Sequence, residues 1–523
     1  MKKILGLLLV FTFALVLVAC QTTSLSTTSA PTSTSVSTST ILSTSPTTSI
    51  STATSTVSST TGSTTTQQTT TTTTAQTTTP PQPVTITYAA WNLGPAQSEN
   101  PNLERLMIQA FMQRYPWITV NIVERPKIPD PSGTSEIDQN WNEFLAARAA
   151  QGILPDVYFT DSTETIIMNN WVRDMSSIAL SDPEFLNVAS DIRNAANYGG
   201  KLMALPYAVY YFGYFINKTI FDESNADAPT FEDTWDEFTA KIRDVAVQNV
   251  TDGTGIAGLL GTDRLLEWFP AQLNSRLGWY TYDGSLLNLN GPEFEQTLNM
   301  YITLMQDKSY VYDALTAEEK TAAFNTMDAW GSSKLAAYWE YTPIIGSMLN
   351  YDFDIDFIGT PGTQTNHRIP VIIDLMGISS QTQNPEAAYL LAKWMSFGKE
   401  GYLKRIELST TVQGVNALNM TPLQQDEDLL DAFFGIYSSF TEFRKVVSHD
   451  SYILEPNKHV PGYIEARWKA NYDVTQTVGQ VFDKVRSGVL SYADVKNTWN
   501  SIANNELTLA RNAVYRKLGV PVS

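Results

Sequence analysis

The segment from Gln21 to about Pro83 limits how much of this 523-residue chain can fold. It consists almost entirely of serine and threonine, with a few proline and glutamine residues and no charged or aromatic side chain. Such a composition cannot bury enough apolar surface to offset the entropy that is lost on ordering. We therefore expect a disordered linker over residues 20–83, open to glycosylation on its hydroxyl groups, and a folded part over residues 84–523.

The first residues predict export and membrane anchoring. Two lysines precede an apolar run from Ile4 to Ala19, which is too short to span a bilayer comfortably but has the length of the hydrophobic part of an export signal. Residues 1–19 are therefore interpreted as a lipoprotein signal peptide. Leu17 to Cys20 resembles the lipobox of bacterial lipoproteins, whose cysteine receives a diacylglyceryl group. We expect Cys20, the single cysteine, to be lipidated and to hold the protein on the outer face of the cell membrane. An incidental thiol in a signal peptide or membrane helix is the alternative.

Composition argues against several classes of function. The chain has 53 acidic and 34 basic residues, and its formal net charge of −19 disfavours nucleic acid as a partner. Its three histidines, His367, His449 and His459, are too widely spaced for a zinc motif, and the sequence has no Gly-x-Ser-x-Gly elbow or phosphate-binding loop. We expect no cofactor, no metal and no enzymatic activity.

The stretch from Tyr351 to Ile358 has the alternating aspartates of a calcium-binding loop. However, Phe357 stands where such a loop requires glycine, and Thr363 stands where it requires the closing glutamate. Because apolar residues alternate with the acids, we interpret this stretch as a strand with a solvated acidic face.

Periodicity predicts an α/β fold. Thr85 to Trp91 and Ile118 to Ile122 alternate like strands, and the intervening residues carry an apolar helical stripe that begins after Asn100. This β-α-β pattern implies a parallel pair in an open sheet. A helix near residues 141–151 precedes a buried strand at Asp156 to Phe159, which would deliver Asp161 to the carboxyl edge, where open sheets bind ligands. Residues 234–237 and 316–319 have the pattern of capping boxes, and residues 473–514 read as helical throughout.

Five segments, in order, resemble the extracellular solute-binding proteins of family 1, which include maltose-binding protein. The most specific is YGGKLMALPYAVYYFGYFINK, from Tyr198 to Lys218, which resembles the family's first crossover between lobes. The others are ILPDVYFTD from Ile153, APTFEDTWDEF from Ala228, NPEAAYLLAKWM from Asn384, and the closing HVPGYIEARWK and SGVLSYADV from His459 and Ser487. Together they cover nearly all of the chain after the linker.

The resemblance implies a periplasmic-binding-protein-like fold with two α/β lobes, several interlobe crossings and a cleft between the lobes. It places residues 84–209 and 359–399 in lobe 1, and residues 210–358 and 400–523 in lobe 2. The region from about Thr410 to Asp450 is longer and more acidic than expected for the family, so the third crossing is only loosely placed. The resemblance also implies capture of a carbohydrate, expected to be an oligosaccharide, and its delivery to the permease subunits of an ABC transporter.

A sugar site needs carboxylates and amides for the hydroxyl groups of the ligand and aromatic rings for its apolar faces. Glu340 is preferred among the acids because it stands between two rings, where the family usually has a Gly-Pro-Trp turn. Trp268 and Trp339 can equally be core residues, and Asp161 and Asp374 can be caps or solvated strand ends. The positions that match the family's ligand-contacting loops are Trp91, Asn92, Asp161, Tyr210, Trp268, Trp339, Glu340, Tyr341, Asp374 and Tyr463.

Three alternatives remain open on the sequence. The same fold could bind an amine or polyamine, because rings and carboxylates also bind cations. A surface glycoside hydrolase could use two of the many carboxylates. An adhesin could share the anchor and the linker without needing a closed pocket.

Overall fold

A computed structural model describes residues 82–94, 100–133 and 135–522. The predicted signal peptide, Cys20 and nearly all of the predicted linker lie outside these residues. The described strands are β1 (Val84–Ala89), β2 (Ile118–Ile122), β3 (Lys127–Pro129), β4 (Glu136–Asp138), β5 (Val157–Thr160), β6 (Asn197–Tyr198), β7 (Lys201–Leu202), β8 (Leu205–Asn217), β9 (Ala257–Leu260), β10 (Leu335–Tyr341), β11 (Ile355–Phe357), β12 (Ile369–Ile378) and β13 (Tyr452–Leu454).

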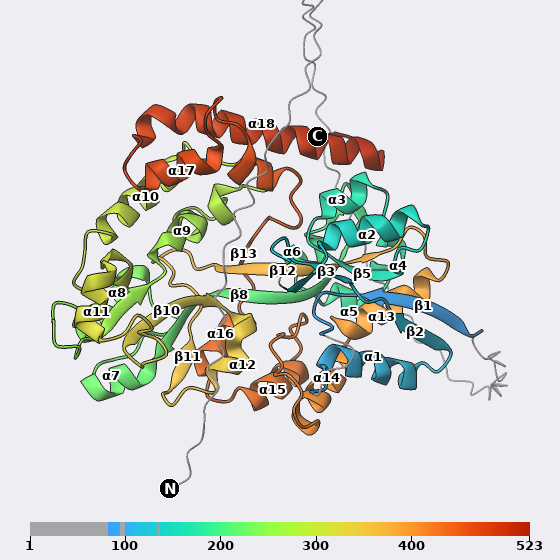
Figure 1. The fold of residues 1–523 in the computed structure, drawn as a ribbon, viewed down its shortest axis with the longest axis horizontal. Coiled ribbons are helices and arrows are strands. Elements are labelled where there is room, and N and C mark those ends of the chain that lie inside the picture. Colours follow the sequence, from blue (N-terminus) through green and yellow to red (C-terminus); the bar gives the residue numbers. More distant parts are fainter. Residues whose placement is uncertain (1–81, 95–99, 134, 523) are drawn as a thin grey trace, which may run out of the picture. The chain divides into compact units, whose positions relative to one another are not determined.

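Helices surround these strands on both sides (Figure 1). They are α1 (Leu103–Arg114), α2 (Trp141–Ala150), α3 (Thr163–Met168), α4 (Ser176–Ala179), α5 (Pro183–Leu186), α6 (Ser190–Asn194), α7 (Lys218–Ser224), α8 (Trp235–Val245), α9 (Leu265–Leu273), α10 (Pro292–Leu304), α11 (Ala317–Phe324), α12 (Ile345–Met348), α13 (Pro385–Met395), α14 (Lys399–Thr411), α15 (Glu427–Ile436), α16 (Thr441–Ser448), α17 (Val478–Arg486) and α18 (Tyr492–Leu518). Within the described part of the chain, no helix has both the length and the apolar character needed to span a bilayer.

The main sheet has the strand order β2-β1-β5-β12-β8-β10-β9, with β13 beside β12 and β11 beside β8. Strands β1 and β2 are parallel and are connected through α1, which confirms the predicted β-α-β unit. The long strand β8 pairs with β12 up to Tyr211 and with β10 from Phe212 onward. It therefore links the half that contains β1, β2 and β5, here called lobe 1, to the half that contains β9 and β10, here called lobe 2.

Local signals predicted the helix starts well. Both expected capping boxes form, with Thr234 bonded to Glu237 at α8 and Thr316 bonded to Glu319 at α11. The prediction of continuous helix over residues 473–514 is wrong at two places. Asp473 caps a turn before α17, and Gly488, at φ +72°, breaks the chain between α17 and α18.

The aspartate-rich stretch is a strand only at β11, where its acid is buried, whereas Asp352 and Asp354 before this strand are exposed. Asp356 is buried and its carboxylate accepts hydrogen bonds from the Thr441 hydroxyl and from the backbone N–H groups of Thr441 and Glu442, at the start of α16. The acid therefore satisfies orphan N–H groups at a helix start. Burial raises the pKa of Asp356, against the lowering effect of these hydrogen bonds.

A buried ion pair joins two helices of lobe 1. The guanidinium of Arg405 in α14 bonds both carboxylate oxygens of Glu104 in α1, and both residues are buried. The Tyr207 hydroxyl on β8 donates to the same carboxylate. Thus α14, which the sequence interpretation assigned to lobe 2, packs on α1 and α13 of lobe 1. The other lobe boundaries drawn from the sequence remain a prediction.

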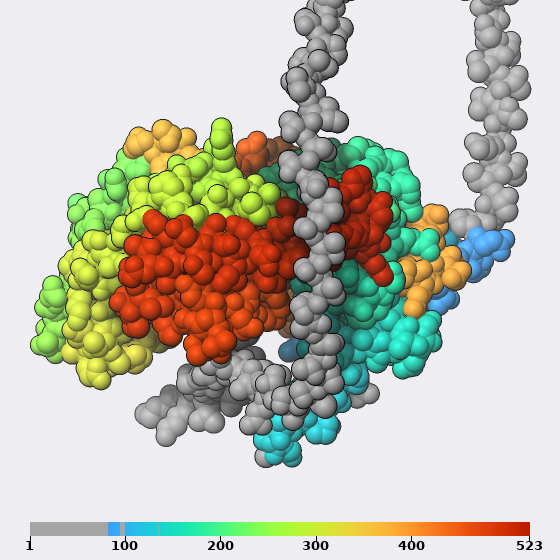
Figure 2. All heavy atoms as spheres, turned by 90° about the horizontal axis from the view of Figure 1, so that it is seen from above, coloured from blue at the N-terminus to red at the C-terminus, as the bar shows by residue number. Residues whose placement is uncertain are grey.

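The last helix, α18, spans both lobes, as Figure 1 shows. Its first half buries Trp499, Ala503 and Leu507 in the core of lobe 2. Near the end of α18, Val514 belongs to the hydrophobic cluster that includes the buried residues of lobe 1. The Leu518 carbonyl accepts a hydrogen bond of 2.7 Å from Lys201 Nζ. Seen from above, the red surface of α18 crosses from lobe 2 onto lobe 1 (Figure 2).

Candidate functional site

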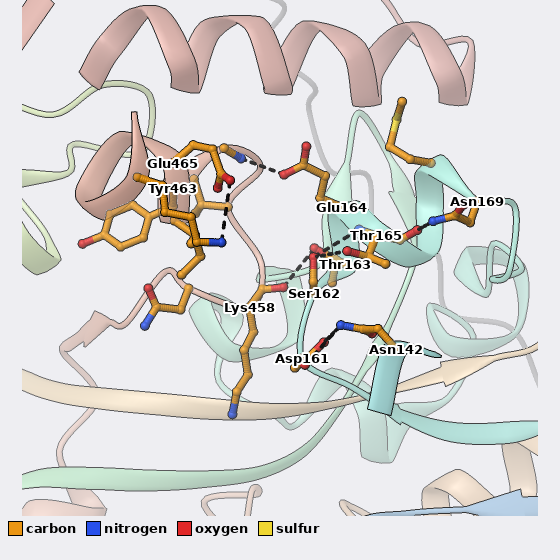
Figure 3. A pocket seen from close by; sticks show the side chains of 16 residues that line it. Asn142, Asp161, Ser162, Thr163, Glu164, Thr165, Asn169, Lys458, Tyr463 and Glu465 are labelled. Carbon is orange, nitrogen blue, oxygen red and sulfur yellow. Dashed lines mark hydrogen bonds and ion pairs between the residues drawn. The ribbon is translucent and has the colours of Figure 1, made fainter. Parts of the chain in front are cut away.

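A cleft of about 690 Å³ lies between the lobes, beneath α18 (Figure 3). Lobe 1 contributes the loop after β5 and the helix α3. The opposite wall is the segment 457–469, which runs from β13 toward α17. Because the parallel strands β1 and β5 end on this side, the cleft occupies the edge where open α/β sheets bind ligands.

Asp161 lines the lobe 1 wall of this cleft. It directly follows β5 and its exposed carboxylate accepts bonds of 3.2 and 3.4 Å from Asn142 Nδ2. The other amide atom, Asn142 Oδ1, is buried and has no hydrogen-bond partner among the described residues. The exposed carboxylate of Asp161 is therefore the group of this pair that can accept hydrogen bonds from a ligand. The strand-end position of Asp161 agrees with the sequence, whereas its contact with a ligand remains a prediction.

The floor of the interlobe region is one face of β8 and β12. Side chains alternate along a strand, so Tyr210 and Phe212 lie on the same face of β8, beside Ile372 and Asp374 of β12. Asp374 forms an ion pair with Lys458, which itself lines the cleft. Burial raises the pKa of Tyr210, and the negative charge of Asp374 raises it further.

A column of stacked rings supports this floor from lobe 2. Trp268 and Trp339 stack at 5.8 Å, Trp339 and Phe212 at 6.3 Å, and Phe212 and Tyr341 at 5.5 Å. Trp268 is 0% exposed and is core, while Trp339 is buried between rings. Tyr341, which is 37% exposed, and Phe212, which is partly exposed, are the two rings of the column that can face a ligand. The other rings hold these two in place.

Glu340 lies on the face of β10 opposite to the two rings that flank it in sequence. Its carboxylate accepts a 3.3 Å bond from the Tyr338 hydroxyl, and Tyr338 stacks on Trp330 away from the ring column. Burial raises the pKa of Glu340. The structure therefore gives this carboxylate a partner that the sequence argument did not foresee.

The residues after β1 lie outside the set that lines the cleft. Trp91 packs edge-on against Trp141 and Phe159, at 5.5 and 4.9 Å. Asn92 Nδ2 donates to the Tyr207 hydroxyl at 3.0 Å. Both side chains are thus held by lobe 1, and their predicted contact with a ligand has no support from the cleft lining.

A second, smaller cavity of about 190 Å³ adjoins the cleft. The two share Asn457 and the predicted site residue Tyr463. The sequence interpretation missed most of this lining, because it treated HVPGYIEARWK only as part of a family helix. The dense mixture of charged and aromatic residues in EARWK was the available signal. The small cavity is lined by Phe212, Arg264, Glu267, Trp279, Ile372, Glu455, Asn457, Tyr463, Arg467 and Trp468.

Hydrogen bonds join the segment 457–469 to lobe 1. The Thr163 N–H donates to the Lys458 carbonyl at 2.8 Å, and the Gly462 N–H donates to the Glu164 carboxylate at 2.8 Å (Figure 3). The Tyr198 hydroxyl donates to the His459 carbonyl at 2.6 Å. These bonds therefore join lobe 1 to the segment that forms the opposite wall of the cleft. Among the described residues, no cluster of His, Cys, Asp or Glu could hold a metal ion.

Comparison with known proteins identifies the family. Residues 96–397, more than half of the chain, match the model of the bacterial extracellular solute-binding proteins. The chain belongs to this family, which is one of binding proteins rather than enzymes. A comparison with curated proteins gives no match.

Solved structures share the fold at low sequence identity. An ABC substrate-binding protein from Listeria monocytogenes in complex with cycloalternan has 16% identity and a TM-score of 0.53, covering 84% of this chain and 100% of that one. A cyclic alpha-maltosyl-1,6-maltose binding protein from Arthrobacter globiformis has 15% identity and a TM-score of 0.56, covering 81% and 99%. A cyclo/maltodextrin-binding protein complexed with maltotetraose has 15% identity and a TM-score of 0.56, covering 84% and 98%. These likenesses confirm the two-lobed α/β fold.

Proposed function

We propose that the protein captures a carbohydrate, in particular an oligosaccharide, between its lobes and delivers it to the permease subunits of an ABC transporter. The observation that carries this proposal is the chemistry of the two adjoining cavities. Carboxylates and amides of both walls, such as Asp161, Asn142 and Glu465, suit hydroxyl groups, and the rings of Trp279 and Trp468 suit the apolar faces of a sugar. The ligands named for the three similar structures, all oligosaccharides, support the same class.

The transport step follows from the way the lobes are connected. A ligand that contacts Asp161 on lobe 1 and Glu465 on the opposite wall stabilises the closed arrangement, and a permease can distinguish closed from open forms. We further propose that lipidated Cys20 keeps the protein on the outer face of the cell membrane. The acidic side chains of the cleft also make a polyamine the second candidate ligand.

Thermal unfolding with ligands separates these candidates. For the chain from Gln21 onward, we expect a linear or cyclic α-glucan to raise the midpoint, because a ligand at a hundred times its Kd adds about 2.7 kcal/mol to the native state. A neutral sugar should bind almost equally in low and high salt, whereas polyamine binding should weaken as salt increases. A shift with polyamines alone would replace the carbohydrate by an amine.

Substitution of Asp161 tests the cleft directly. We expect Asp161→Ala to weaken sugar binding by about 10-fold to 100-fold, since a hydrogen bond to a charged group contributes about 1.5–3 kcal/mol. The matched control is Asp352→Ala, which removes an exposed aspartate of lobe 2 that does not line the cleft. Equal affinities for both variants in titration calorimetry would remove Asp161 from the site.

Closure has its own readout. We expect small-angle scattering to show a smaller radius of gyration when a saturating sugar is present, because bridging contacts favour the closed form. Unchanged scattering with a sugar that calorimetry shows to be bound would contradict the closure step and leave the binding function intact.

A further inference from the structure

Arg467 is a buried arginine without a polar partner. It is 3% exposed, and no hydrogen bond or ion pair joins it to any residue that the structure describes. Its guanidinium instead lies over the rings of Tyr280, Trp468 and Phe482, at 3.8, 3.7 and 4.1 Å. Buried charges are normally paired, because desolvation without compensation is strongly unfavourable. Five donors are therefore held in place with nothing from the protein to receive them.

Two more unpaired polar groups border the same small cavity. Tyr463 is 1% exposed and its hydroxyl has no partner, and the buried Oδ1 of Asn457 has none either. Both residues line the 190 Å³ cavity together with Arg467. The cavity thus gathers donors from arginine and tyrosine and an acceptor from an amide. A ligand with several neighbouring hydroxyl groups can satisfy all three.

The rings of the cavity suit one flat, partly apolar unit. Trp279 and Phe212 pack against each other at 5.2 Å on the lobe 2 side. Trp468, which is 40% exposed, lies in the same short π-helix as Arg467. Such π-helical turns occur often at functional sites. Rings around a small volume, with donors beside them, match one sugar ring rather than a chain of several.

The charges around the cavity do not single out an ionic ligand. Arg264 and Glu267 form an ion pair at 3.4 Å. Glu267 also lies within electrostatic reach of Arg467, and Glu455 is the second carboxyl of the lining. The hydroxyl groups of a neutral polyol can pair with both carboxyl groups as well as with Arg467, so a neutral ligand fits the whole lining.

We propose that the 190 Å³ cavity is an end subsite, which takes one terminal sugar ring with Arg467 donating to its hydroxyl groups. The rest of the ligand then passes Asn457 and Tyr463 into the 690 Å³ cleft, because these two residues line both cavities. This inference rests on the proposed function and narrows it. The ligand is an oligosaccharide of two or more units, one end of which is held at Arg467.

A length series measured by titration calorimetry tests the subsite. The probes are glucose and the linear series from maltose to maltohexaose, titrated into the chain from Gln21 onward. In the wild type we expect at least one step of added length to raise affinity about tenfold. In Arg467→Met and in Trp468→Ala that step should disappear, while the affinity for the shorter probe stays within about twofold of the wild type. Arg467→Lys, which keeps the charge but not the planar fork, should recover only part of the step.

Controls separate the subsite from simple damage to the fold. Trp117→Ala removes a partly exposed tryptophan beside the edge strand β2, outside the lining of both cavities, and should leave the length dependence unchanged. Trp468 is partly exposed, so its variant remains informative if loss of Arg467 unfolds the protein. Equal weakening at every length, or no weakening, overturns the end subsite while the sugar-binding function stands. Stronger binding of a probe with a terminal hexuronate, lost in Arg467→Met, overturns the neutral class of ligand. A wild type that binds no member of the series contradicts the proposed function itself.

Discussion

Arg405→Met is expected to lower the free energy of unfolding by about 3–5 kcal/mol, because it leaves the carboxylate of Glu104 buried without its ionic partner. Arg405 is 2% exposed and Glu104 is 6% exposed, so water cannot replace the lost contacts. One oxygen of this carboxylate still accepts the 2.8 Å bond of the Tyr207 hydroxyl, which does not neutralise its charge. Equilibrium unfolding in urea, monitored by circular dichroism, measures the change.

The double variant Glu104→Leu/Arg405→Met distinguishes the charge effect from lost packing. Removing both charges leaves no unpaired ion, so the double variant should be clearly more stable than Arg405→Met alone. Arg114→Met is the control on the same helix, because the ion pair of Arg114 with Glu400 is exposed and should contribute little. If the double variant is as unstable as the single one, packing rather than the buried charge determines the loss.

Features set by neighbours in the sequence were predictable. The β-α-β unit around α1 and the capping boxes at Thr234 and Thr316 depend on residues a few positions apart. The position of Asp161 at the carboxyl edge of the sheet followed from the local hydrophobic pattern of the strand before it. In each case side chain periodicity or a cap specifies the backbone directly, so no tertiary information was needed.

The orientation of Glu340 could not be predicted in this way. The sequence analysis placed Glu340 in a turn between Trp339 and Tyr341, and in a turn all three side chains could face a ligand. The strand β10 continues through Tyr341, and alternation therefore sends Glu340 to the other face, toward Tyr338. The end of a strand is the least certain part of a sequence-based assignment, and here a shift from turn to strand reverses the direction of a carboxylate.

The small cavity could not be derived from spacing alone. Its walls come from β8, α9, β12 and the segment after β13, which only the fold brings together. The larger cleft has the same origin, since the bond of the Thr163 hydroxyl to the Lys458 carbonyl joins two of its residues that are 295 positions apart. The burial of Trp268 is likewise a tertiary property, because an aromatic residue in a helix looks the same in sequence whether it faces a core or a cleft.

The second large effect concerns Glu455 and pH. This residue is 4% exposed, and burial raises its pKa to about 8, while nearby Lys458 lowers it and Glu267 raises it. The unfolded chain has a glutamate pKa of about 4.3. Between these two values the folded protein holds a proton that the unfolded chain has lost, so stability falls as pH rises toward 8. The contribution of Glu455 to the free energy of unfolding is complete below about pH 4.3 and is lost by about pH 8.

Buried His459 also affects how stability depends on pH, on the acidic side. Burial lowers its pKa to about 4, with the charge of Lys458 adding to the effect. Because the unfolded value is about 6.5, the unfolded chain binds the extra proton between these values, and His459 makes stability rise with pH over that range. The two slopes oppose each other below about pH 6.5, so the effect of Glu455 stands alone only above that pH.

We therefore expect the unfolding free energy of the wild type to fall by about 2 kcal/mol between about pH 6.5 and 8, because one unit of pH changes the contribution of one proton by about 1.36 kcal/mol. The unfolding free energy of Glu455→Gln should change little over the same range, because glutamine does not titrate. Urea unfolding at a series of pH values measures both slopes. Glu386→Gln, which removes an exposed carboxylate of α13, should keep the wild-type slope. Parallel profiles for the wild type and Glu455→Gln would mean that Glu455 is already ionised in the folded protein. In that case the small cavity would hold a negative charge at neutral pH, next to the guanidinium of Arg467.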